Sequence, residues 1–328
     1  MKIWFSKYQL YPKGSLNSKS KTKFRQGALL RVRSEEGTVG YSDLCPFSEM
    51  GDRPIDLELT ELSKGRLSSL AQRSLYFANL DAEARAKNES LFRSQCNIKN
   101  HFLISDITRF DLHRAAKIEL AGYTEFKIKL GRDLVSETES LKNFCSALSA
   151  TSKVRLDFNC ITSVERFTNW FDTNQKWLRP TLEFIEDPFA YDANEWRNVS
   201  QKWGLTLALD QAADAISTGG EGAQILVIKP AVYDSSAIIE KFKGTSKKFV
   251  FTHYMDFPVG QMFALVEAQR AYQLVRDQFL TCGLQHHDIY EGFTFQDAIK
   301  YDGPYVLPPD GKGIGFDSLL NSLKWIEI

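Results

Sequence analysis

Long hydrophobic runs are absent from this sequence, and cysteines are few. No window approaches the ~20 apolar residues that a membrane-spanning helix requires, and the first residues contain too short an apolar run for a signal peptide. The five cysteines are an odd number at wide spacings, and no CxxC motif occurs. Because this pattern does not fit a disulfide framework, we expect reduced thiols in a cytoplasmic protein that has no membrane partner.

The sequence also lacks an excess of charge of either sign. Lys plus Arg and Asp plus Glu each number 41, so the formal net charge is zero. A basic excess is the usual footprint of a protein that binds nucleic acid or an anionic membrane, so we expect neither as a partner. The composition, 43% hydrophobic and 25% charged, is typical of a globular enzyme, and 328 residues suffice for one large domain and a smaller one.

Two regions of different pattern divide the chain. Residues 1–100 predict an α+β unit, because strand-like runs at 27–33 and 38–43 flank a turn and precede helical spacing over 57–87. Residues 101–304 repeat a strand–helix pattern, which is typical of a parallel sheet. The Gly- and Pro-rich stretch 305–315 is expected to leave the second region, so that the tail, about 305–328, completes the first.

Eight strand-like segments lie in the second region, and their number favours a closed barrel over an open sheet. The expected fold class is α/β: a modified TIM-type (β/α) barrel preceded by the α+β unit, with its active site at the carboxyl ends of the strands. The last segment is weakly marked, so the final unit of the barrel is expected to be irregular. The segments are residues 102–107, 125–130, 153–159, 182–188, 206–211, 225–230, 247–253 and 282–284.

Polar side chains stand near the ends of five consecutive strand segments. Because side chains alternate along a strand, Lys127 and Lys129 share one face while Phe126 and Ile128 share the other. The same parity places the downstream polar residues on the inner faces of their strands. In chain order the set is Lys127, Lys129, Asp157, Glu186, Asp210 and Lys229.

Three crowded carboxylates repel one another and stay ionised only beside a cation. We therefore expect Asp157, Glu186 and Asp210 to hold Mg²⁺, with Mn²⁺ as a possible substitute, and to leave open positions for a small-molecule carboxylate substrate. A neighbouring ammonium and the metal charge lower the pKa of a lysine. Lys129, nearer the rim of the barrel, is then the candidate base, and Lys127 tunes it.

The order Lys-x-Lys, Asp, Glu, Asp, Lys resembles the enolase superfamily, in its muconate-lactonising-like subgroup, over nearly the whole chain. Within that subgroup the segment Arg155-Leu-Asp-Phe-Asn159 is similar to that of the o-succinylbenzoate synthase family, as is Ile228-Lys-Pro230. The resemblance implies that the α+β unit is a capping domain, whose loops near 13–25 and 45–52 close over the barrel mouth. It also implies a dehydratase, a carbon–oxygen lyase of menaquinone biosynthesis.

The resemblance further implies roles for individual residues. Lys127, Lys129 and Lys229 would be the catalytic lysines, with Lys229 facing the substrate from the side opposite Lys129. The substrate-binding residues would be Arg155, Asn159, Thr252 and Gly260. One departure is Gln211-Ala212, where relatives often carry Glu-Ser, and another is Phe158, which parity points away from the site.

Three functions remain open. The first, which the resemblance implies, is dehydration of 2-succinyl-6-hydroxy-2,4-cyclohexadiene-1-carboxylate to o-succinylbenzoate through an enediolate. The second is racemisation of N-acylamino acids, dipeptide epimerisation or cycloisomerisation on the same site, because lysines on both faces of a carbon permit it. The third is a noncatalytic barrel used for binding, which the retention of every acid and base disfavours. The oligomeric state has no signal in the sequence.

Overall fold

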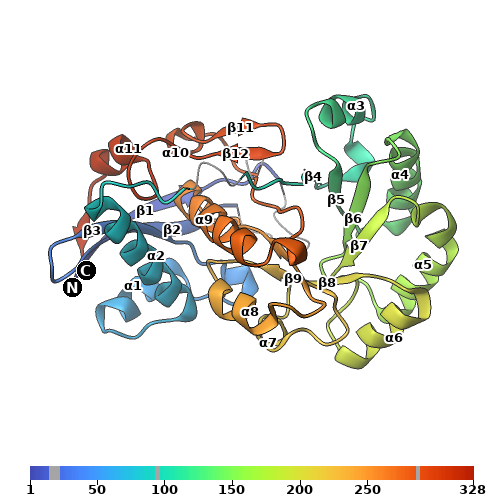
Figure 1. Cartoon of the computed structure of the whole chain (residues 1–328), viewed down its shortest axis with the longest axis horizontal. Coiled ribbons are helices and arrows are strands. Elements are labelled where there is room, and N and C mark those ends of the chain that lie inside the picture. The colour runs from blue at the N-terminus through green and yellow to red at the C-terminus, as the bar shows by residue number, and fades with distance from the viewer. Residues whose placement is uncertain (15–22, 93–96, 286–288) are drawn as a thin grey trace.

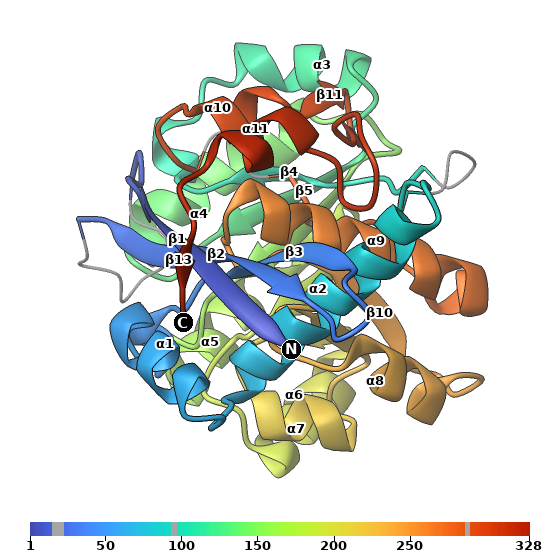
Figure 2. The ribbon, with the colours of Figure 1, turned by 90° about the vertical axis from the view of Figure 1, so that its left-hand side faces the viewer.

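The computed structural model describes residues 1–14, 23–92, 97–285 and 289–328. Its N-terminal part is a four-stranded antiparallel sheet of order β13-β1-β2-β3, with two helices beside it (Figures 1 and 2). The helix α2 packs against β3, where Gly40 lies so close to α2 that a Cβ would meet the Ala78 carbonyl oxygen. The elements are β1 (Lys2–Leu10), β2 (Arg25–Arg33), β3 (Val39–Leu44), α1 (Ile55–Ser63), α2 (Ser69–Ala86) and β13 (Ile326–Glu327).

The chain end returns to this first sheet. Strand β13 pairs with β1 through Phe5 and Ile326, so the last residues form one edge of the N-terminal sheet (Figure 2). Before it come the hairpin β11 (Lys300–Asp302) and β12 (Tyr305–Leu307), and the helices α10 (Thr294–Asp297) and α11 (Asp317–Ser322). Strand β1 was not predicted from the sequence. Its residues are mostly half-exposed on both faces, so they lack a clear apolar alternation.

The second part of the chain is a curled, parallel, seven-stranded sheet whose order follows the sequence, from β4 to β10. Helices follow the strands and cover the outside of the sheet (Figure 1). The strands are β4 (Phe102–Ile104), β5 (Glu125–Lys129), β6 (Lys153–Asp157), β7 (Leu182–Glu186), β8 (Leu207–Leu209), β9 (Ile225–Ile228) and β10 (Lys248–Phe251). The helices are α3 (His113–Leu120), α4 (Leu134–Ala147), α5 (Val164–Leu178), α6 (Ala193–Trp203), α7 (Ala213–Thr218), α8 (Ser235–Phe242) and α9 (Pro258–Leu274).

The eighth segment of the barrel is not a strand, which corrects the expectation for residues 282–284. Isolated parallel bridges join Thr252 to Gly283 and Asn100 to Cys282, and so connect the two edges of the seven-stranded sheet. The Asn100 side chain accepts a hydrogen bond from the Leu284 amide at 2.7 Å, a link that a regular ladder would have made through the backbone. The fold is therefore a modified (β/α) barrel, as the sequence indicated, with an irregular final unit.

Alternating side chains divide the barrel strands into an outer and an inner layer. Phe126, Ile128, Val154 and Leu156 face outward and belong to the large hydrophobic core shared with the helices. A separate small cluster fills the inside of the barrel: Phe184, Ala208, Ile225, Val227 and Val250. Several of its members stand two residues before a polar residue at a strand end, so the floor of the site is apolar and its rim is polar.

Three further expectations concern the first barrel segment, membrane-spanning helices and the cap loop near 13–25. The segment 102–107 is a strand only over its first three residues, and its last residue begins a 3₁₀ helix, Ile107–Arg109. Two more 3₁₀ helices occur among the described residues, Ser48–Met50 and Arg276–Gln278. Within the described ranges, no helix has both the length and the apolar character needed to cross a membrane. Residues 15–22 of the expected cap loop near 13–25 lie outside the described residues.

Candidate active site

The six predicted polar residues stand at the carboxyl ends of five neighbouring strands. Lys129, Asp157 and Glu186 end β5, β6 and β7 and are paired directly across the sheet. Asp210 and Lys229 follow β8 and β9 by one residue. The parallel ladder therefore brings together residues that are up to about a hundred positions apart, as expected for a barrel rim.

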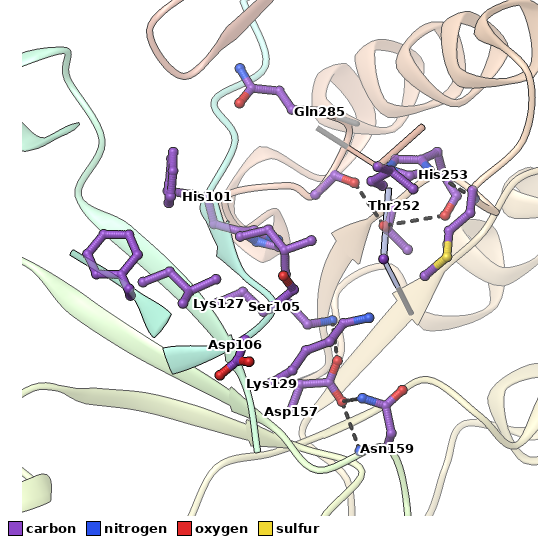
Figure 3. A pocket seen from close by; sticks show the side chains of 18 of the residues that line it. His101, Ser105, Asp106, Lys127, Lys129, Asp157, Asn159, Thr252, His253 and Gln285 are labelled. Carbon is purple, nitrogen blue, oxygen red and sulfur yellow. Dashed lines mark hydrogen bonds and ion pairs between the residues drawn. The ribbon is translucent and has the colours of Figure 1, made fainter. Parts of the chain in front are cut away.

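Two ion-pair groups connect these side chains. The Lys127 ammonium lies 3.0 Å from Asp157 Oδ2 and 2.6 Å from Glu186 Oε1. The Lys229 ammonium lies 2.6 Å from Asp210 Oδ1. Figure 3 shows Lys127, Lys129 and Asp157 pointing toward the same region, with Asn159 beside Asp157.

A cavity of about 750 Å³ opens over this rim. Asp157, Asp210 and all three lysines line it, and Glu186 lies beneath it, only 1% exposed. A volume of this size accommodates a small organic acid. The three lysines, Asp157 and Asp210 therefore face one cavity.

Burial and neighbouring charges separate the two lysines of the Lys-x-Lys motif. Burial, followed by the charges of Lys127 and Arg132, lowers the pKa of Lys129 to about 8, against the opposing pull of Asp157. Burial also disfavours the Lys127 ammonium, but Asp157 and Glu186 raise the pKa of Lys127 above its usual value. Lys129 is thus the residue suited to accept a proton near neutrality, while Lys127 stays charged.

The carboxylates respond to the same surroundings. Burial, together with the charges of Asp157 and Asp210, raises the pKa of Glu186 to about 7 despite the contact with Lys127. Burial and the nearby acids also raise the pKa of Asp187, whose Oδ2 has no hydrogen-bond partner in the described part of the chain. With Asp187, four acids stand beside three lysines, so full ionisation of the acids requires a further cation.

A divalent cation fits the donor set, although the carboxylates are not gathered around one point. Among the described residues, no three acidic, histidine or cysteine side chains are grouped closely enough to share an ion. Instead, the Lys127 ammonium lies between Asp157 and Glu186, so this position already holds a positive charge. Carboxylate oxygens are the donors that Mg²⁺ prefers, and a cation there would favour the ionised forms of the buried acids.

The predicted substrate-binding residues fall into two groups. Asn159 and Thr252 line the cavity. Arg155 is fully buried one layer below Asp157, where it pairs with Glu183 at 2.7 Å, and it does not line the cavity. Gly260 lies in the first turn of α9, away from the cavity lining.

Gln211 has a defined place in the site. Its amide donates to Asn159 Oδ1 at 3.2 Å, and Asn159 donates to Asp157 Oδ1 at 2.9 Å. Asn159 has a φ of +48°, a conformation that asparagine tolerates better than most residues. Gln211, which stands where glutamate is more usual, therefore orients Asp157 through the uncharged side chain of Asn159.

Several residues that line the cavity were not identified from the sequence. Three are arginines: Arg109 and Arg114 follow β4, and Arg132 follows β5. Single basic residues have no periodic pattern, so only their position after a strand end could have suggested them. They make the cavity more cationic on the side of Lys129.

The site suits abstraction of a proton beside a carboxylate. A lysine with a lowered pKa faces carboxylates that can hold a cation, and a second lysine faces the same space from β9. The matching family model is described as "O-succinylbenzoate synthase, N-terminal domain" and covers residues 3–84. An o-succinylbenzoate synthase from Bdellovibrio bacteriovorus is 31% identical over 331 residues, which cover 100% of this chain and 99% of that protein.

Solved structures show the same fold at low identity. An o-succinylbenzoate synthase from Thermosynechococcus elongatus, complexed with Mg in its active site, aligns with a TM-score of 0.70 at 18% identity, over 89% of this chain and 95% of that one. A dipeptide epimerase from Cytophaga hutchinsonii, complexed with Mg and D-Ala-L-Val, aligns with a TM-score of 0.78 at 16% identity, over 100% and 99%. By its full-length similarity, the chain belongs to the o-succinylbenzoate synthase family, a family of dehydratases.

Proposed function

We propose that this protein is a Mg²⁺-dependent dehydratase that converts 2-succinyl-6-hydroxy-2,4-cyclohexadiene-1-carboxylate to o-succinylbenzoate, a step of menaquinone biosynthesis. The observation that carries the proposal is that Lys129, with its lowered pKa, lines one cavity together with Asp157 and Asp210, while the buried Glu186 lies beneath them. Full-length similarity to a curated synthase supports the same assignment. The expected cytoplasmic location stays a prediction.

The mechanism requires one lysine to act twice. Lys129 removes the proton from the ring carbon that bears the carboxylate, and the electron pair moves onto that carboxylate as an enediolate. Asp157, Glu186 and Asp210 would hold Mg²⁺, which would supply positive charge to stabilise this dianion, a contribution of several kcal/mol, and Mn²⁺ is expected to substitute. Lys129 then donates that proton to the hydroxyl group, which lies on the same side of the ring. The hydroxyl leaves as water, and the ring becomes aromatic.

Lys229 supports the reaction from the other side of the barrel rim. Its ammonium is paired with Asp210 at 2.6 Å and lies 6.0 Å from the centroid of the Tyr254 ring. A cation at this position stabilises negative charge developing on the substrate. In the dehydration it exchanges no proton with the substrate.

The charge of the cavity suits a substrate with two carboxylates. The proposed substrate has one carboxylate on the ring and a second at the end of the succinyl chain. Arg109, Arg114 and Arg132 give the cavity three cations beyond the lysines, whereas Asp106 is an acid that pairs with Arg109 at 3.4 Å. We assign the succinyl carboxylate to this arginine side, where guanidinium groups offer paired donors.

An ultraviolet assay of the cyclohexadiene substrate tests the proposal. Wild type with Mg²⁺ should consume the diene and form the aromatic product, chelation of the metal should abolish the reaction, and Lys129→Ala should be inactive. Lys142→Ala, which removes an exposed lysine of α4, is the matched control and should react like wild type. Absence of turnover by wild type would reject the function, and normal turnover by Lys129→Ala would reject the base.

A racemase or epimerase is the second candidate, because Lys129 and Lys229 line the same cavity from β5 and from the end of β9. Such an enzyme would exchange the α-proton of an N-acylamino acid or a dipeptide with solvent. Incubation in D₂O followed by mass spectrometry detects that exchange. Deuterium uptake without dehydration of the cyclohexadiene would favour this second function over the first.

A further inference from the structure

A buried arginine joins the N-terminal part of the chain to the barrel beside the cavity. Arg25 begins β2 and is only 4% exposed. One terminal nitrogen donates to the carbonyl oxygens of Tyr254 at 3.1 Å and Met255 at 2.5 Å, in the loop after β10. The other donates to the carbonyl oxygens of Cys45 at 3.1 Å and Pro46 at 3.2 Å, in the loop after β3.

Aromatic rings enclose the same guanidinium group. Its central carbon lies 4.2 Å from the centroid of the Phe47 ring and 5.8 Å from that of Tyr254. The Tyr290 hydroxyl accepts from Arg25 at 3.1 Å and itself donates to the Met255 carbonyl oxygen. Three segments that are far apart in the sequence therefore meet on one planar cation.

The loop that Arg25 holds forms part of the cavity wall. Thr252, His253 and Met255 line the cavity, and the ring of Tyr254 lies beside the Lys229 ammonium. Met255 has a φ of +52°, in the left-handed region. For a residue other than glycine this conformation costs about 1–2 kcal/mol and persists only when its surroundings hold it.

We propose that Arg25 is a positioning residue that fixes the loop 252–256 against the loop 45–52 and so holds the cavity wall in place next to Lys229. The two terminal nitrogens of the planar guanidinium group reach carbonyl groups on two loops at once, while its flat faces pack on rings. A lysine at this position would offer a point charge that reaches fewer of these acceptors and does not stack in the same way. The inference rests on the proposed function for its activity readout.

Arg25→Lys keeps the charge and removes the planar contacts, so it is the decisive variant. We expect kcat/KM for dehydration to fall by about 10- to 100-fold, the range that a misplaced site wall costs. Arg25→Ala should be less active still, and guanidinium ions in the millimolar range should restore part of its activity, whereas methylammonium at the same ionic strength should not. A merely stabilising contact would not produce this selectivity between the two cations.

Arg85→Lys is the matched control. Arg85 is a half-buried arginine of α2 that pairs with Asp81 and Asp317 and donates to the Gly315 carbonyl oxygen, away from the cavity. Its substitution should lower the melting temperature without changing kcat/KM, and guanidinium should not affect its activity. A similar loss of kcat/KM in Arg85→Lys would show that any weakened contact of the N-terminal part suffices, and would overturn the inference.

Hydrogen exchange separates this inference from the proposed function. In the free protein, Arg25→Lys should speed amide exchange in residues 252–257 and 45–52 relative to wild type, a result that needs no substrate. Unchanged exchange in both loops, or wild-type kcat/KM in Arg25→Lys, would overturn the role of Arg25. Wild type that fails to dehydrate the cyclohexadiene would instead overturn the proposed function, and the exchange result would still decide the inference.

Discussion

Replacing Asp256 with asparagine is predicted to stabilise the protein above neutral pH. Asp256 is 2% exposed, and its Oδ1 has no hydrogen-bond partner among the residues described. A Cβ at Gly260 would lie 2.7 Å from Asp256 Oδ2 and 2.6 Å from Asp43 Oδ2, so the two carboxylates share one small space. Burial raises the pKa of Asp256 to about 6.

The magnitude follows from the difference between the folded and unfolded pKa. An unfolded aspartate has a pKa of about 3.9, so the shift is about two units, or about 3 kcal/mol. Because the folded pKa is the higher one, the folded state binds the proton more tightly. The stabilisation is complete below about pH 4 and is lost as the pH rises through about 6. Asparagine carries no charge at either pH and avoids this loss.

Thermal unfolding at several pH values measures the effect. With an unfolding entropy of ~2.1 cal/mol/K per residue over 328 residues, about 3 kcal/mol corresponds to a rise of about 4 °C in Tm. Asp256→Asn should therefore unfold about 4 °C above wild type at pH 8 and close to it at pH 4, and Asp302→Asn, at an exposed position, should show no such difference. A lower Tm for Asp256→Asn at pH 8 would refute the reasoning.

Four further predictions follow from the site and its surroundings. Since Lys129 must be neutral to act as a base and its pKa is about 8, kcat/KM should rise with pH through about 8 and level off above it, and a decrease between pH 6 and 8 would contradict the assignment. Phe158→Leu should cost about 1–2 kcal/mol in denaturant unfolding without changing Mg²⁺ affinity, because its ring packs on α5 outside the barrel. Gly260→Ala should cost about 1–3 kcal/mol in the same assay, because a methyl group would meet two carboxylates, and an unchanged midpoint would show that they move aside. Arg114→Ala should raise KM more than it lowers kcat, whereas Lys117→Ala, on an exposed part of α3, should leave both unchanged.

Strand parity was the most informative signal in the sequence. It placed Asp157, Glu186 and Lys229 on the inner side of their strands, and Phe184 and Val227, two positions before Glu186 and Lys229, do fill the inside of the barrel. It also pointed Phe158 outward, where its ring lies 5.4 Å from the ring of Phe167. These predictions needed only the two-residue period of a strand and the burial of one face.

Other features depend on contacts that no local pattern records. The eighth barrel segment is closed by isolated bridges and by the side chain of Asn100, so it has no alternation to detect. Arg155 shares a face with Asp157 but lies one layer deeper, and parity alone does not give depth. The link from Arg25 to the Tyr254 carbonyl spans 229 residues and is visible only in the folded chain.

A crystal structure grown with Mn²⁺ tests the central claim most directly, because anomalous diffraction locates the ion. We predict one ion at the rim of the barrel, bound by oxygens of Asp157, Glu186 and Asp210, with the Lys127 ammonium moved out from between the first two. An ion bound elsewhere, or a rim in which Lys127 remains between the carboxylates and no ion is present, would contradict this assignment.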